Sequence, residues 1–223
     1  MATALIAGAS GLVGGLLLRE LLAAGEHRRI TAVGRRPVDL EHTRLRQVAV
    51  DFAALEKAGD DLQADDVFCC LGTTMHRAGS REAFRAVDHG AVLALAWAAK
   101  RAGARRFFLV SSLGADAAAR GFYLRVKGET EEALMVLGFD VLNIFRPSLL
   151  LGPRTESRPG ERLAQAALWV AEPLLLGRWR KYRAVDAATV ARAMLRVSFA
   201  RGERGVRVFE SDEIEDLGRF APG

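Results

Sequence analysis

Cysteine is scarce in this chain of 223 residues, and long apolar runs are absent. Cys69 and Cys70 are adjacent in an apolar run, so on a strand their side chains point to opposite faces and cannot link distant segments. This excludes a disulfide framework and favours two reduced strand residues in a reducing compartment. No stretch approaches the roughly 18 apolar residues of a membrane span, and the N-terminus lacks the pattern of a signal peptide. The sequence therefore predicts a cytoplasmic protein without a membrane span.

Metal-binding and nucleic-acid-binding patterns are also weak. No Cys and His cluster has metal-ligand spacing, so no metal site is predicted. The net charge of +5 comes from 32 Lys+Arg against 27 Asp+Glu, scattered along the chain, and the many arginines are typical of a GC-rich bacterial genome. The basic and aromatic run RWRKYR at 178–183 can bind nucleic acid, but scattered charge favours a solvated or substrate-facing segment. No nucleic-acid partner is predicted.

Apolar runs of strand length alternate with helical patterns along the chain. We expect strands at 3–7, 29–33, 45–50, 66–71, 106–110, 140–145 and 205–210, and helices at 12–24, 81–102, 123–137, 161–170 and 186–199. The run DVFCCL is apolar on both faces, which is typical of a parallel sheet covered on both sides. The alternation predicts an α/β fold, a Rossmann-like doubly wound parallel sheet with ligands at the carboxyl ends of its strands.

The length of the chain favours one domain. We expect residues 1–150 to form a cofactor-binding core. From Gly152 to Gly160 the composition turns to Pro, Arg, Glu and Ser, which predicts a loop. Residues 151–223 are then expected to form a small C-terminal substrate-side lobe.

The sequence GASGLVG follows the first expected strand and opens the first expected helix. Its G-x-x-G-x-x-G spacing lets the backbone approach a pyrophosphate and points helix N-terminal N–H groups at it. Glycines also serve bare structural turns, but this position favours a dinucleotide site, and no Lys-Ser/Thr pair supports a triphosphate loop. The expected cofactor contacts are Gly8, Ser10, Gly11, Leu12, Val13 and Gly14.

Arginine stands where an NAD-binding chain would carry an acidic residue. The second strand ends in Arg35 and Arg36, and a guanidinium can bind a 2'-phosphate that a carboxylate would repel. NADP(H) is therefore favoured over NAD(H); the alternative is two solvated arginines at a strand end. Asp51 and Phe52, just past the third strand, lie where an adenine amino group would find an acceptor, although Asp51 is equally suited to a helix N-cap.

Tyr123 and Lys127 are four residues apart in a helical segment, so both side chains lie on one face. An ammonium beside a phenol favours the phenolate and lets tyrosine act as a general acid or base. This spacing alone is common by chance. Ser111 and Ser112 follow the RFFLV strand, where a hydroxyl can donate to a substrate carbonyl or make only turn hydrogen bonds. Ser112 is the predicted catalytic serine of the two.

Several stretches together resemble a known family: AGASGLVG, AVGRR, FCCLGTT, LVSSLGAD, FYLRVKGETE, IFRPSLLLGPR and ESRPGE. They resemble the short-chain dehydrogenase/reductases, and more closely the atypical, epimerase/dehydratase-like branch of NAD(P)H-binding oxidoreductases related to the Tat-interacting protein of animals. The resemblance covers nearly the whole chain. It implies a cofactor loop at the three glycines, 2'-phosphate recognition by Arg35, adenine contact at Asp51 and catalytic Ser112, Tyr123 and Lys127. It further implies cofactor contacts at Leu71, Gly72, Thr73, Arg146 and Pro147.

One position departs from the family's pattern. Asp88, in FRAVDHG, stands where the family usually has an asparagine that takes part in a proton relay with the lysine. A carboxylate beside Lys127 can hold a relay water or form an ion pair.

The sequence thus predicts an NADP(H)-dependent oxidoreductase that transfers a hydride to or from a small carbonyl or alcohol substrate with a Ser-Tyr-Lys site. The alternative is a non-catalytic NADP(H)-sensing regulatory protein that binds a protein partner. The complete Ser-Tyr-Lys set favours the enzyme. Arg154 and Arg158 make an anionic substrate one option, and the chain fits either a monomer or a homodimer.

Overall fold

The computed structural model describes residues 1–52, 55, 62–152, 177–200 and 204–219. The helix expected at 161–170 lies outside the described residues, as do Arg154 and Arg158 and nearly all of the loop expected from Gly152 to Gly160.

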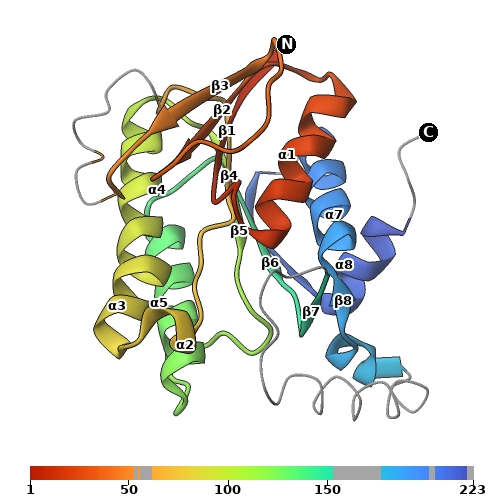
Figure 1. Ribbon diagram of the computed structural model, residues 1–223. Coiled ribbons are helices and arrows are strands. Elements are labelled where there is room, and N and C mark those ends of the chain that lie inside the picture. The colour runs from red at the N-terminus through yellow and green to blue at the C-terminus, as the bar shows by residue number, and fades with distance from the viewer. Residues whose placement is uncertain (53–54, 56–61, 153–176, 201–203, 220–223) are drawn as a thin grey trace.

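The main sheet has seven parallel strands within the described ranges, in the order β3-β2-β1-β4-β5-β6-β9 (Figure 1). Strand order reverses between β1 and β4, the position where doubly wound sheets bind nucleotides. The predicted α/β, Rossmann-like parallel sheet is confirmed. Its strands are β1 (Ala2–Ala7), β2 (His27–Gly34), β3 (Leu45–Ala49), β4 (Asp66–Cys69), β5 (Arg106–Val110), β6 (Val141–Arg146) and β9 (Gly205–Glu210).

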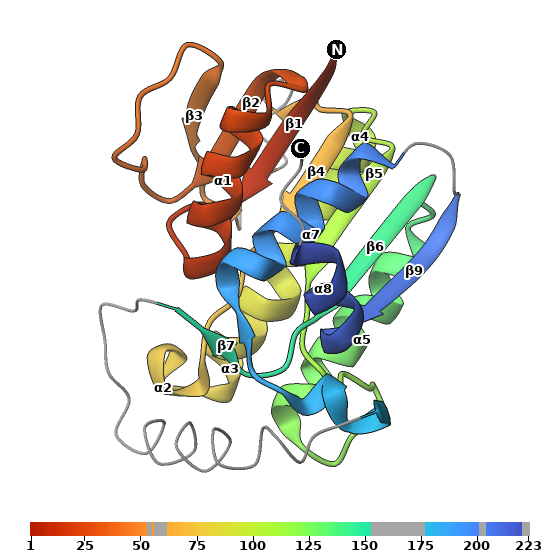
Figure 2. The ribbon, with the colours of Figure 1, turned by 90° about the vertical axis from the view of Figure 1, so that its right-hand side faces the viewer.

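Helices cover both faces of the sheet (Figure 1). One face carries α1 (Leu12–Ala24), α7 (Ala187–Phe199) and α8 (Ser211–Gly218), which lie toward the viewer in Figure 2. The other carries α4 (Val92–Arg101) and α5 (Phe122–Val136). Phe108 stacks on Phe68 under the first layer, with ring centroids 4.7 Å apart, while its neighbour Phe107 is buried in the core under the second. Burial of both neighbours explains why the strand runs are continuously apolar.

The two cysteines lie on opposite faces, as the sequence predicts. Cys69 belongs to the core under α4 and α5, whereas Cys70 packs against the core under α1. Both thiols are free. Burial raises the pKa of Cys69 to about 12 and also raises the pKa of Cys70, so both stay thiols at neutral pH.

The last part of the chain completes the main sheet. Strand β9 pairs with β6, α7 packs on α1, and α8 packs on α7. Asp186 is the N-cap of α7, because its carboxylate accepts a hydrogen bond of 2.7 Å from the Ala188 N–H. A separate two-stranded sheet, β7 (Leu150–Leu151) with β8 (Val185–Asp186), lies beyond the carboxyl ends of the main strands (Figure 1). The division near residue 150 stays a prediction.

The helical pattern at 81–102 contains an interruption. The sequence predicts one long helix with a gap at Gly90. In the structure, α2 (Met75–Ala78) and α3 (Arg81–Arg85) precede a π-helical turn, η3 (Ala86–Ala91), which leads into α4. Such a turn places an extra residue in the helix and often occurs at functional sites.

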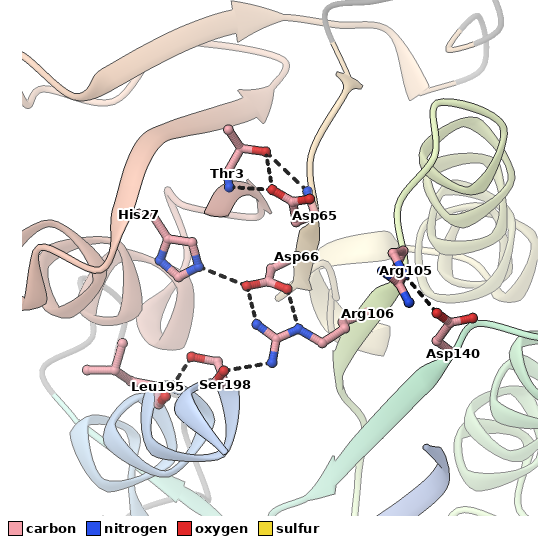
Figure 3. Close-up of polar contacts among 9 residues, drawn as sticks. All are labelled: Thr3, His27, Asp65, Asp66, Arg105, Arg106, Asp140, Leu195 and Ser198. Atoms are coloured by element: carbon pink, nitrogen blue, oxygen red, sulfur yellow. Dashed lines mark hydrogen bonds and ion pairs between the residues drawn. The ribbon is translucent and has the colours of Figure 1, made fainter. Parts of the chain in front are cut away.

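A buried polar network joins the amino ends of the strands (Figure 3). The Asp66 carboxylate, at the start of β4, accepts two hydrogen bonds of 2.5 Å from Arg106 on β5. It also lies 2.9 Å from His27 Nε2 on β2. Arg106 donates a further hydrogen bond of 2.7 Å to the Ser198 carbonyl of α7. Asp66 therefore links strands β2, β4 and β5 at the amino edge of the sheet, and Arg106 links them to α7.

Candidate active site

The predicted site residues follow the strands of the main sheet. Gly8 comes after β1, Arg35 after β2, Leu71 after β4, Ser112 after β5, and Arg146 ends β6. Because parallel strands end at the same edge, the fold brings these positions to the carboxyl edge, around the reversal in strand order.

The glycine loop is packed tightly against the end of β4. Gly8 has a φ of 84°, and its carbonyl accepts a 2.9 Å hydrogen bond from the Gly11 N–H. A Cβ on Gly8 would lie 2.4 Å from the Cys70 carbonyl oxygen, and one on Gly14 would lie 2.2 Å from the Gly8 carbonyl oxygen. Any other residue at Gly8 or Gly14 would clash with the backbone of this turn, so the turn requires glycine at both positions.

The start of α1 fits a phosphate group. Its N-cap is Gly11, which has no side chain to accept from the first turn, and no acidic residue stands in that turn. Ser10 and Gly11 are exposed. Val13 is buried in the core and Leu12 packs against it, so we expect these two residues to contribute mainly backbone N–H groups. Uncapped N–H groups and the helix dipole together favour an anion here.

The end of β2 carries unopposed positive charge. Arg35 and Arg36 are exposed, and none of the hydrogen bonds or ion pairs found in the described ranges involves either side chain. Asp51 is exposed beyond the neighbouring β3, while Phe52 packs against the core under α4. The site residues present thus fit a dinucleotide.

Asp88 connects Lys127 to the turn after β4 by an ion pair and a hydrogen bond. The Lys127 Nζ lies 2.7 Å from Asp88 Oδ1, and the Thr73 N–H donates to Asp88 Oδ2 at 2.8 Å. Both charged residues are buried, with Asp88 only 1% exposed. Gly72 lies over the pair, since a Cβ there would be 3.4 Å from Asp88 Oδ1, and Leu71 packs partly buried beside it. The sequence left an ion pair and a relay water open for Asp88, and the structure has the ion pair.

The charge of Lys127 is stabilised by its neighbours. Burial lowers the pKa of Lys127, but the negative charge of Asp88 and the nearby Tyr123 raise it by more, so the pKa lies above the usual 10.5. Lys127 is an ammonium at neutral pH.

The Tyr123 side chain packs against the protein with its ring and is partly exposed to solvent. It lies in the first turn of α5, as predicted, one helical turn before Lys127. Its ring packs on Phe84 of α3, with centroids 5.4 Å apart, and the residue is 37% exposed. A substrate can therefore approach a side chain whose ring is fixed.

The two serines after β5 differ in availability. Ser111 is buried and donates to the Glu131 carboxylate, which also accepts from the Arg146 guanidinium at 3.1 Å. Ser112 is partly exposed, with only a long 3.5 Å contact to a neighbouring carbonyl. The choice of Ser112 as the catalytic serine stays a prediction. The side chain of Arg146 is engaged by Glu131 and Pro147 is buried, so we expect any cofactor contact there to be made by backbone.

Two residues of this region were missed from the sequence. Glu131 joins Ser111 to Arg146, and Gly128 lets the loop after Ser112 pack on α5. A glycine inside a helix, directly after Lys127, was the available signal for such a close approach.

Replacement of Gly128 with alanine is expected to displace this loop. The new Cβ would lie 2.2 Å from the Ala117 nitrogen, so the free energy of unfolding should fall by about 1–3 kcal/mol or more. Urea denaturation measures the loss. Gly121→Ala is the matched control, because no atom lies within 4 Å of a Cβ at Gly121, and equal losses in the two variants would contradict the packing described.

The basic run at 178–183 makes contacts within the chain. It forms the short 3-10 helix η5 (Gly177–Tyr182). Arg180 lies 2.6 Å from Asp216 of α8, and Lys181 lies 2.8 Å from Glu210 at the end of β9. These pairs neutralise part of the charge that suggested nucleic acid.

The part of the chain that the structure describes holds neither a cluster of metal-ligating residues nor a membrane-spanning helix. No three His, Cys, Asp or Glu residues there are placed to hold a metal ion. None of the helices there combines the length and apolar character needed to cross a membrane.

The parallel sheet, the glycine turn at its crossover and the basic end of β2 define the class as a Rossmann-fold nucleotide-binding protein. Residues 8–165 match the NAD(P)H-binding domain family, and the chain belongs to this family. This confirms the resemblance to NAD(P)H-binding proteins.

Two curated relatives align over nearly the whole chain. Protein HTATIP2 of Rattus norvegicus is 40% identical over 222 residues, which cover 98% of this chain and 90% of HTATIP2. The mitochondrial protein FMP52 of Coccidioides immitis is 33% identical over 243 residues, which cover 98% of this chain and 97% of FMP52.

Solved structures share the fold. WbmH of Bordetella bronchiseptica, in complex with NAD+, has a TM-score of 0.69 at 19% identity, covering 98% of this chain and 79% of WbmH. The UDP-Glc/GlcNAc 4-epimerase of Campylobacter jejuni has a TM-score of 0.69 at 14% identity, covering 97% of this chain and 82% of the epimerase. At these identities the likeness shows the fold.

Proposed function

We propose that this protein is an NADP(H)-dependent oxidoreductase of the short-chain dehydrogenase/reductase type, acting on a small carbonyl or alcohol compound. The observation that carries the proposal is the pair of Tyr123 and Lys127 on one face of α5, with the Lys127 ammonium beside the turn at Gly72 and Thr73. Membership of an NAD(P)H-binding family supports the cofactor class.

The residues of the site divide between holding the cofactor and moving a proton. The glycine loop and the start of α1 would hold the pyrophosphate, Arg35 and Arg36 the 2'-phosphate, and Lys127 the ribose of the nicotinamide. The cofactor supplies or accepts the hydride. Tyr123 gives a proton to the substrate oxygen or takes one from it, and Ser112 donates a hydrogen bond to that oxygen.

The substrate class and the cellular setting remain part of the proposal. A small-molecule substrate fits the partly exposed Ser112 and Tyr123 at the carboxyl edge. A cytoplasmic location and a monomeric or homodimeric state stay predictions.

The proposed activity is tested by following NADPH oxidation with a panel of aldehydes, ketones and quinones. We expect consumption of NADPH that depends on the carbonyl compound and saturates with it. Tight NADPH binding without turnover of any carbonyl compound would contradict the proposed oxidoreductase activity. It would favour the alternative, a non-catalytic NADP(H)-sensing protein.

Arg35→Ala is expected to weaken NADPH binding about tenfold to a hundredfold, because one charged group's hydrogen bonds to the 2'-phosphate are lost. NADH binding should be nearly unchanged. Calorimetric titration of both nucleotides measures the two dissociation constants. Arg28→Ala, which removes the same charge from the amino end of β2, is the control, and an equal effect on NADPH and NADH in Arg35→Ala would contradict 2'-phosphate recognition.

A further inference from the structure

Gln47, on the edge strand β3, holds the loop that follows β2 (residues 35–44). Its Oε1 accepts a hydrogen bond of 2.7 Å from the Val38 N–H. Its Nε2 donates to the Val38 carbonyl at 3.1 Å and to the Leu40 carbonyl at 3.0 Å. The side-chain amide thus uses its oxygen and its nitrogen on the backbone of one loop, which lies beside β3 (Figure 2).

Apolar contacts hold the same part of the loop. Val38 and Leu40 are half-buried and pack against the core under α1. Gln47 is paired with Ala32 of β2, which is buried in that core. The exposed Pro37 has a φ fixed by its ring, directly before Val38. Contacts within the chain therefore order this part of the loop.

The loop carries charges of both signs. Arg35 and Arg36 are exposed at its start, and Asp39 and Glu41 are exposed further along. A guanidinium attracts the 2'-phosphate of NADP(H), whereas a carboxylate repels it and suits the free hydroxyl of NAD(H). The nucleotide that the loop favours therefore depends on which of these charges its backbone brings to the ribose. Gln47 holds the residues on both sides of Asp39, so it fixes the course of the backbone between the two kinds of charge.

We propose that Gln47 is a positioning residue for cofactor selection, which holds the loop in the conformation that presents Arg35 and Arg36 to the 2'-phosphate of NADP(H). Because its hydrogen bonds are made within the protein, binding of the nucleotide does not have to order the loop. Without them, contact with the 2'-phosphate would require ordering of residues 36–40, at a cost in conformational entropy that NAD(H) binding does not carry. This inference rests on the proposed function, because NADP(H) is the cofactor proposed there.

Gln47→Met tests the inference, because methionine has a similar length and makes none of the three hydrogen bonds. Calorimetric titration measures the dissociation constants of NADP+ and NAD+, which differ only in the 2'-phosphate. We expect NADP+ binding to weaken about tenfold and NAD+ binding to stay within about twofold. Gln63→Met is the matched control, since Gln63 is an exposed glutamine shortly before β4, and it should leave both constants unchanged.

A double-mutant cycle separates positioning from a merely structural role. In an Arg35→Ala, Arg36→Ala background the loop has no guanidinium to present, so Gln47→Met should weaken NADP+ binding by less than about twofold. A merely structural role would weaken NAD+ binding as well, and it would add the same loss in both backgrounds.

A second variant loosens the same loop and leaves the Gln47 amide in place. Pro37→Gly gives the backbone more freedom between Arg36 and Val38, at an exposed position. It should therefore weaken NADP+ binding and leave NAD+ binding nearly unchanged. This variant takes the place of Gln47→Met if the latter does not fold.

Two results would overturn the inference. One is a folded Gln47→Met protein, or a Pro37→Gly protein in its place, with the same ratio of NADP+ to NAD+ affinity as the parent. The other is an equal loss of affinity for both nucleotides. A parent chain that binds NADP+ no better than NAD+ would instead contradict the cofactor choice of the proposed function, and the inference with it. None of these measurements requires turnover, so they are separate from the test of the proposed activity.

Discussion

Replacing Tyr123 with phenylalanine is expected to lower the turnover of NADPH with a carbonyl substrate by about a hundredfold to ten-thousandfold, the usual contribution of a positioned general acid. The phenylalanine ring keeps the packing on Phe84, because that contact involves only the ring. NADPH binding should change little, since Lys127 and the glycine loop are untouched. Steady-state rates and nucleotide titrations of the purified variant measure the two effects separately.

Tyr182→Phe is the matched control for this prediction. Tyr182 lies in η5 and packs on Trp179, with ring centroids 5.7 Å apart. It should keep the parent rate. A Tyr123→Phe variant that turns over as fast as Tyr182→Phe would remove Tyr123 from the proposed mechanism.

Replacing Asp66 with alanine is expected to lower the free energy of unfolding by about 3–5 kcal/mol, the usual loss when one partner of a buried ion pair is removed. Asp66 is fully buried, and its loss leaves the Arg106 guanidinium without both of its carboxylate hydrogen bonds. His27 also loses its partner. Urea denaturation measures the change.

The neighbouring pair of Arg105 and Asp140 supplies the control (Figure 3). It is an exposed ion pair at the same edge of the sheet, with a distance of 2.8 Å. Exposed pairs contribute little to stability because water screens them, so Asp140→Ala should leave the urea midpoint nearly unchanged. Equal losses in Asp66→Ala and Asp140→Ala would contradict the role given to the buried network.

The fold was predictable because its signals are local. Strand-length apolar runs such as DVFCCL alternate with amphipathic helices, and parallel sheets buried on both faces require that pattern. The glycine turn was also predictable from its G-x-x-G-x-x-G spacing, and in the structure Gly8 and Gly14 occupy positions where the backbone leaves no room for a Cβ. Tyr123 and Lys127 were found by helical spacing, and the structure places both on α5.

The contacts between these residues were not predictable, because they join distant segments. Nothing in the local sequence shows that Ser111 donates to Glu131 or that Thr73 donates to Asp88. The π-helical turn was not predictable either, because a single extra residue barely changes an apolar pattern that Gly90 already interrupts. In the sequence, Asp66 and Arg106 are polar residues at the starts of two separate strands. Their contact follows only from the pairing of β4 with β5.

The most direct test of the central claim is a crystal structure of the protein with NADP(H). The account predicts the pyrophosphate at the start of α1 beside the glycine loop, the 2'-phosphate at Arg35, and the nicotinamide ring facing Tyr123 and Ser112. A nucleotide bound elsewhere, or bound with its nicotinamide turned away from Tyr123, would contradict it.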